Sequence, residues 1–295
     1  MKTVSTNMLN LLNSQVPYAM ADLYTITDTY GDTFYMTDCD VPITLSGTTW
    51  LPNQVILTRT KTKMVLGIET DVMTVHMSPV IGGTTLAGAN NPFAGQGLLQ
   101  ALRGGWLDGG RIKVDRFVGA SFTDFSCGSI SMFAGRVGEV DVTRTNAVIQ
   151  VRSDLELLDM QLPKQLFQYA CVHTLYDTGC TVNSASFSFS GTVGAGATLT
   201  SIPVSGTSQA DGYFALGKIV FTSGANKGFT MGVRDYVSNV ATLSYALPNP
   251  PTVGDAFTIY AGCDKQIATC QNKFSNQVNF KGFPYVPTPE TVTYY

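Results

Sequence analysis

Four of the six cysteines have a spacing that could support metal chemistry. They form two pairs, Cys171 with Cys180 and Cys263 with Cys270, separated by eight and six residues. If the segment between the pairs folds back on itself, four thiolates meet at one place, as tetrahedral zinc or an iron–sulfur cluster requires. These spacings are looser than the short loops of zinc ribbons, so they do not name the metal. Two disulfides, or four unconnected buried thiols, are the alternatives.

The remaining cysteines and the two histidines give weaker signals. Cys39 and Cys127 each stand alone in a β-rich segment, which favours small buried hydrophobic residues over a mutual disulfide. His173 follows Cys171 by two residues and could replace a ligand, but we expect it only to line the site. His76 lies in a predicted strand without a second histidine nearby, so we expect a hydrogen-bonded sheet residue.

The composition excludes several classes of function. Of the 295 residues 13% are charged, well below the roughly 25% of an average protein, and the net charge is −3. A sequence-specific nucleic-acid binder needs clustered Lys and Arg, which this chain lacks. No apolar run is long enough for a membrane segment, and the first residues do not resemble a secretory signal, so we expect synthesis in a reducing cytoplasm. Because no Ser-His-Asp or Cys-His set has a supporting context, we predict that the chain is not an enzyme.

The first 160 residues predict a β-rich module with few short helices. Apolar residues at helical spacing favour a helix over residues 5–15, ended by Pro17, and one or two helical turns over 97–102. Alternating patterns separated by turn residues favour strands, including two hairpins. The expected strands are residues 23–27, 34–37, 42–45, 48–51, 72–77, 112–118, 130–137, 139–144 and 146–151. A leucine-dense stretch around Pro163 then marks the connection to a second module.

Residues 161–295 predict a smaller domain with an inserted β module over about 183–260. Phe187 and Phe189 alternate with serine, which favours an extended strand over a free linker. Further strands are expected over residues 213–221, 229–236, 241–243 and 256–260. The predicted fold class is therefore mainly β, with a β-sheet or barrel-like first module and a C-terminal β module closed by a four-Cys metal site.

The C-terminal sequence resembles a known family of phage tail proteins. Residues 260–270 read YAGCDKQIATC, and Phe274, Asn276, Asn279, Phe280, Gly282, Phe283, Pro284 and Pro287 follow. This run resembles the AGCDK…TC…F.N..NF.GFP..P ending of the family, and residues 171–180 resemble its C…LYD..C element. Residues 217–221 and 226–228 also fit. The family is the baseplate or tail-tip hub protein of long non-contractile-tailed phages and gene transfer agents, similar in role to the tail-tip protein L of phage lambda.

The resemblance implies a structural role in a virion, with assembly in the host cytoplasm. Hubs of this family are trimers that close the end of the tail tube and join the distal tail protein to the central tail-tip or fibre protein; the tape measure protein is a further candidate partner. In this family four cysteines hold a [4Fe–4S] cluster, which implies that Cys171, Cys180, Cys263 and Cys270 do so here. Zinc stays an alternative, and a redox or cell-wall-degrading enzyme is the rival function. The tyrosine-rich last residues lie outside the motif.

Overall fold

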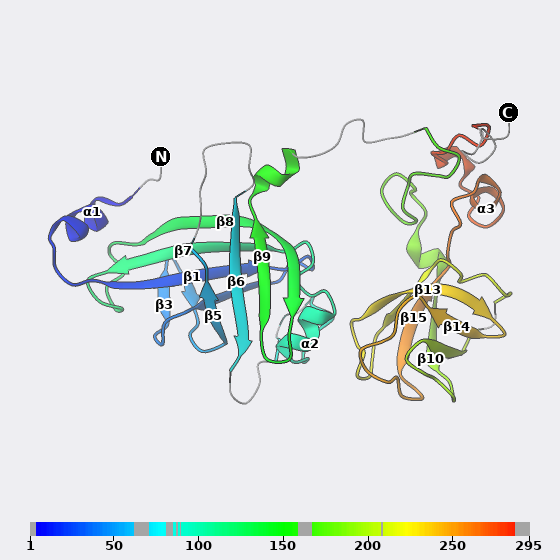
Figure 1. The fold of residues 1–295 in the computed structure, drawn as a ribbon, viewed down its shortest axis with the longest axis horizontal. Coiled ribbons are helices and arrows are strands. Elements are labelled where there is room, and N and C mark those ends of the chain that lie inside the picture. The colour runs from blue at the N-terminus through cyan, green and yellow to red at the C-terminus, as the bar shows by residue number, and fades with distance from the viewer. Residues whose placement is uncertain are drawn as a thin grey trace. The chain divides into compact units, whose positions relative to one another are not determined.

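The computed structural model describes residues 4–61, 71–80, 85, 86, 88, 90–158, 167–207 and 209–286. Contacts within the chain divide it into two compact units, Met1–Met160 and Gln161–Tyr295 (Figure 1). Expectations for Pro163 and its neighbouring leucines, and for the tyrosine-rich end, lie outside the described residues. No helix in the described part is long and apolar enough to cross a membrane.

Antiparallel strands form one seven-stranded sheet in the first unit. They are β1 (Ala19–Thr27), β2 (Thr33–Thr37), β5 (Val55–Arg59), β6 (Val72–Pro79), β7 (Arg111–Gly119), β8 (Ser129–Val142) and β9 (Ala147–Arg152). Their order is β2-β1-β7-β8-β9-β6-β5, and the long strands β7 and β8 run side by side in Figure 1. The hairpin of β3 (Ile43–Leu45) and β4 (Thr48–Trp50), helices α1 (Thr6–Asn13) and α2 (Leu98–Arg103), and the 3₁₀ turn η1 (Asp154–Leu158) complete the unit.

Alternation of apolar residues builds the core of this sheet. On β6 Met73, Val75 and Met77 are buried while the residues between them are partly exposed, as a half-buried strand requires. The sheet also brings edge strand β5 close to β1, the strand next to its other edge: the Arg59 guanidinium on β5 contacts the Asp22 carboxylate on β1 at 2.7 Å. The first unit is therefore a curled sheet rather than a flat one.

A closed six-stranded barrel forms the body of the second unit. Its strands are β10 (Ser188–Val193), β11 (Ser201–Ser205), β12 (Lys218–Phe221), β13 (Thr230–Val237), β14 (Val240–Leu243) and β15 (Ala256–Tyr260). They close in the order β10-β11-β14-β13-β12-β15 around a core that includes Phe214, Phe221, Tyr236 and Phe257. The 3₁₀ turn η2 (Ser184–Phe187) precedes the barrel, and α3 (Ile267–Asn272) and η3 (Gln277–Asn279) follow it.

The mainly β fold with few short helices is confirmed, and so are both predicted hairpins. Three details differ. Residues 130–137 and 139–144 are not separate strands: one strand, β8, spans this region with a bulge between Val137 and Val140. The strand predicted over 213–221 is restricted to β12, because the chain turns at Gly212 and again at Leu216, both with positive φ. Strands β5 and β11 were not predicted.

Candidate functional site

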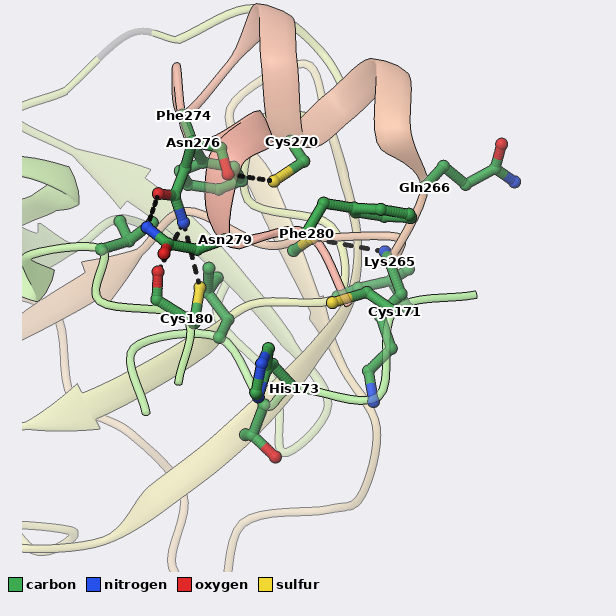
Figure 2. A pocket seen from close by; sticks show the side chains of 15 residues that line it. Cys171, His173, Cys180, Lys265, Gln266, Cys270, Phe274, Asn276, Asn279 and Phe280 are labelled. Carbon is green, nitrogen blue, oxygen red and sulfur yellow. Dashed lines mark hydrogen bonds between the residues drawn. The ribbon is translucent and has the colours of Figure 1, made fainter. Parts of the chain in front are cut away.

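All four cysteines of the two pairs line one cavity of about 170 Å³ in the second unit (Figure 2). Cys171 and Cys180 lie in the loop before η2, Cys263 follows strand β15, and Cys270 lies on α3. The barrel joins these elements, because β10 and β15 are neighbouring strands with antiparallel pairing. The structure thus brings together residues that are 99 positions apart in the sequence at their extremes.

The carboxylate of Asp177 fixes the shape of the first cysteine loop. Its Oδ1 accepts hydrogen bonds from the backbone N–H groups of Gly179 (2.9 Å) and Cys180 (2.5 Å), and its Oδ2 accepts one from Thr174 (2.9 Å). Hydrogen bonds from these N–H groups, with that of Cys180 the strongest contribution, lower the pKa of Asp177. The loop is therefore preorganised by a charged acceptor.

Backbone hydrogen bonds connect the first cysteine loop to the C-terminal segments. The N–H of Cys171 donates to the carbonyl of Lys265 at 2.9 Å, and the N–H of Val172 donates to the carbonyl of Lys281 at 3.2 Å. Asn276 reaches across as well, because its Nδ2 donates to the carbonyl oxygen of Cys180 at 2.5 Å. Three separate segments are thus held around one cavity before any ligand is considered.

Three of the four sulfur atoms accept hydrogen bonds from nitrogen donors. The backbone N–H of Lys265 lies 3.3 Å from Cys263 Sγ, and that of Lys281 lies 3.4 Å from Cys171 Sγ. Asn276 Nδ2 lies 3.8 Å from Cys180 Sγ. Donors aimed at sulfur favour thiolates, and they are one of the means by which proteins set the properties of iron–sulfur clusters. Cys270 differs, since its thiol donates to the carbonyl of Asn276 at 3.3 Å.

Burial disfavours free thiolates at this site. It raises the pKa of Cys270 to about 11, and the negative charges of the other three cysteines add to the effect. Burial is also the largest cause of the raised pKa of Cys263. Burial therefore disfavours the thiolate forms of Cys263 and Cys270 in the absence of a nearby positive charge. A metal centre would supply the positive charge that thiolates need here.

Several residues around the cavity adopt the left-handed backbone conformation that glycine normally fills. Tyr176, Thr181, Lys265 and Ser275 have φ of 71°, 60°, 63° and 49°. Such conformations cost about 1–3 kcal/mol each and persist where the surroundings fix them. The left-handed conformation at Lys265 accompanies a hydrogen bond from its backbone N–H to the sulfur of Cys263. The cysteine segments are thus held in tight, specific turns.

The barrel supports the site through buried polar contacts. The Tyr176 hydroxyl donates to the carbonyl of Ala261 at 2.9 Å, and Lys273 Nζ donates to the carbonyls of Tyr213 (2.5 Å) and Gly262 (2.8 Å). The ammonium also lies 4.4 Å from the centre of the Tyr213 ring, a cation–π distance. Burial lowers the pKa of Lys273. Position 262 requires glycine, since a Cβ there would overlap the carbonyl of Ala215.

The histidines and the other two cysteines agree with the expectations in part: the burial of Cys127 is confirmed and that of Cys39 is not, while the hydrogen bond expected of His76 stays a prediction. His173 lines the cavity, its Nδ1 lies 3.7 Å from the Asp177 carboxylate, and a Cβ on Gly179 would overlap its ring. His76 is on β6, in register with residues of β5 and β9. All six cysteines have free thiols, so neither a Cys39–Cys127 bond nor any other disulfide is present. Cys127 is buried, whereas Cys39 is only partly so.

Sequence reasoning missed the residues that surround the sulfurs. Lys265, Lys281 and Asn276 donate to them, and Lys273 joins α3 to the barrel. Asn276 lay in the quoted motif, but its spacing gives no hint of a partner 96 positions away. Within the described residues, no three His, Cys, Asp or Glu side chains are close enough to hold a single metal ion. The four-Cys metal site predicted from the sequence is therefore not shown by the described residues and stays a prediction.

Matches to known proteins together cover nearly the whole chain. A family model described as "Baseplate hub protein, N-terminal attachment domain" matches residues 5–183, and one described as "Phage conserved hypothetical protein BR0599" matches residues 212–290. A solved chain from "Virion of native gene transfer agent (GTA) particle" is 20% identical with a TM-score of 0.74, covering 99% of this chain and 96% of that one. At that identity the likeness concerns the fold. Comparison with curated proteins gives no significant match.

Proposed function

The chain belongs to the baseplate hub protein family, and from this premise we propose that it closes the end of a tail tube as a subunit of a homotrimer and holds a [4Fe–4S] cluster. Family membership makes it a structural virion protein of the tail assembly. The matched attachment domain spans the described first unit and extends through the first cysteine pair. The cluster and the specific contacts within the tail are the parts that we infer.

The observation that carries the cluster proposal is the convergence of four cysteines on one cavity. A single zinc ion holds four sulfurs at about 2.3 Å and leaves no space between them. Here all four cysteines line one cavity of about 170 Å³, which offers four sulfur ligands and more room than a single ion fills. A cluster of several irons and sulfides is therefore the group that we propose. Zinc is the alternative.

The bound cluster would supply a covalent connection between four thiolates and, where needed, an electron acceptor. The chain itself supplies the four sulfurs, the N–H groups directed at three of them, and the apolar side chains of Phe274 and Phe280 that line the cavity. Two of the proposed cluster ligands precede the barrel in the sequence, before β10, and two follow it, after β15. Binding free energy would therefore appear as folding free energy of the second unit.

The first unit carries a surface suited to protein contacts. Leu9, Leu12, Val16, Tyr18 and Met20, on and after α1, are each 44–53% exposed. Clustered exposed apolar side chains are typical of surfaces that a partner covers. Cyclic symmetry would place three such surfaces around a tail axis. We propose the distal tail protein and the central tail-tip protein as neighbours above and below, the tape measure protein as a further neighbour, and assembly in the host cytoplasm.

Paired substitutions test the ligand assignment. Cys263→Ser should abolish iron incorporation and make the segments around residues 171–180 and 263–283 sensitive to protease. Cys39→Ser is the matched control: it removes a thiol from the first unit, and a serine hydroxyl can keep the contacts to Thr37 and Val41. Full metal content and unchanged protease resistance in the Cys263 variant would show that the ligand assignment is wrong.

A further inference from the structure

We propose that Asn276 is a positioning residue that directs an amide N–H at the sulfur of Cys180, and that Asn279 fixes the direction of that amide. The inference rests on the proposed cluster, because it concerns how one of its four ligands is held. Both asparagines line the cavity beside the cysteines, and Figure 2 shows their side chains directed at Cys180 and at each other.

The orientation of the Asn276 amide follows from its partners. It contacts the backbone carbonyl oxygen of Cys180, which can only accept a hydrogen bond, so the NH₂ group must face Cys180. The opposite side, Oδ1, then accepts a hydrogen bond from Asn279 Nδ2 at 2.7 Å. With the amide held at both ends, its nitrogen lies 3.8 Å from Cys180 Sγ. No other orientation satisfies both contacts.

Asn279 is itself anchored to the first cysteine loop. Its Nδ2 also donates to Thr181 Oγ1 at 2.8 Å, and Thr181 adopts a left-handed conformation directly after the cysteine. Ser275, next to Asn276, has a left-handed conformation as well. The two asparagines and two tight turns therefore form a closed connection between residues 180–181 and the segment after α3.

Cys180 differs from the other sulfurs in the source of its donor. Cys171 and Cys263 accept from backbone N–H groups, which side-chain substitution cannot remove. Among the donors that the structure describes at these sulfurs, only that of Cys180 belongs to a side chain. An N–H directed at sulfur stabilises negative charge there, and a cluster carries more negative charge when reduced. The amide should therefore raise the reduction potential of the cluster and slow its loss.

The test uses the full chain, reconstituted anaerobically with iron and sulfide, in four forms: wild type, Asn276→Asp, Asn279→Ala and Asn272→Asp. Asn276→Asp replaces the NH₂ donor with a carboxylate oxygen at nearly constant volume. Asn272→Asp is the matched control, since it makes the same charge change at the exposed end of α3. The reduction potential is measured by stepwise dithionite titration, and cluster loss by the rate at which a chelator removes iron. Far-UV circular dichroism melting checks that the barrel is intact.

We expect Asn276→Asp to lower the reduction potential below that of Asn272→Asp and to weaken iron retention by about 10- to 100-fold, the usual effect of removing a group that orients a metal ligand. Asn279→Ala keeps the Asn276 amide but removes the hydrogen bond that fixes its direction. It should therefore lower the reduction potential and weaken iron retention as well, by less than Asn276→Asp does. If Asn276→Asp takes up no cluster, the test rests on Asn279→Ala alone. A reduction potential and iron retention equal to wild type in Asn279→Ala would then overturn the inference.

The failures of the two proposals are distinguishable. A wild-type chain that takes up no iron and sulfide overturns the cluster and this inference together. A wild-type chain that loads normally, with Asn276→Asp matching Asn272→Asp in potential and in retention, overturns the role of Asn276 and leaves the cluster standing.

Discussion

Replacing Asp22 with asparagine should destabilise the first unit by about 3 kcal/mol, the lower end of the cost of removing one partner from a buried ion pair. The Asp22 carboxylate accepts from Arg59 Nε at 2.7 Å and from Arg116 at 2.9 and 3.1 Å. Both Asp22 and Arg59 side chains are less than 10% exposed. The asparagine oxygen keeps one acceptor, but the buried guanidinium of Arg59 on β5 loses the charged carboxylate that it contacts at 2.7 Å.

Tryptophan fluorescence measures this change selectively. The chain has two tryptophans, Trp50 and Trp106, and both lie in the first unit, so a urea titration followed by fluorescence reports on that unit and not on the barrel. Asp154→Asn is the matched control. Asp154 pairs with Arg111, both about half exposed, and loss of such a pair costs about 0–1 kcal/mol.

A stabilising role of the Asp22 ion pair is contradicted if Asp22→Asn lowers the free energy of unfolding no more than Asp154→Asn does. That result would mean that the curled sheet does not depend on a charged connection between β1 and β5. A drop of about 3 kcal/mol is a large part of the roughly 5–15 kcal/mol that stabilises a typical domain, so the two outcomes are well separated.

Three further predictions concern pH and the second unit. Burial raises the pKa of Asp22, but hydrogen bonds and charges from Arg116 and Arg59 outweigh burial and lower the pKa below the unfolded value of 3.8. The stabilisation from Asp22 is therefore present above pH 3.8 and is lost as the pH falls through the lower pKa of the folded protein. On acidification from pH 5, the free energy of unfolding measured by fluorescence should fall more for wild type than for Asp22→Asn. Lys273→Met should remove the ammonium donor from the carbonyls of Tyr213 and Gly262, and amide hydrogen exchange should quicken in α3 but not in β13; unchanged exchange in α3 would argue against this connection. Gly179→Ala places a Cβ where the His173 ring lies, so iron uptake should fall while the barrel melts normally, and unchanged uptake would show that the loop adapts.

The hairpins could be predicted because their turns have a local cause. Ser46 and Gly47 both adopt positive φ between β3 and β4, as expected of a two-residue hairpin turn. Strand β11 could not be identified in the same way, because Pro203 argues against a central strand and its place in the barrel is set by partners far along the chain. Next to the turn at Leu216, Gly217 approaches the carbonyl of Tyr260 too closely for any Cβ, so this part of the chain also depends on a residue far along the sequence.

The candidate site could likewise be predicted from the sequence only in part. The residue types and the two spacings were enough to single out Cys171, Cys180, Cys263 and Cys270, and the structure places all four around one cavity. Their role as ligands stays a prediction. The donors at the sulfurs could not be foreseen, since two are backbone N–H groups and the third is a side chain whose direction depends on tertiary contacts.

Anaerobic purification of the full chain, with iron, sulfide and zinc counted per polypeptide, tests whether the four cysteines hold a [4Fe–4S] cluster. We expect a brown protein with about four irons and four sulfides per chain and no zinc. A colourless protein with about one zinc per chain, or one without metal, would contradict it.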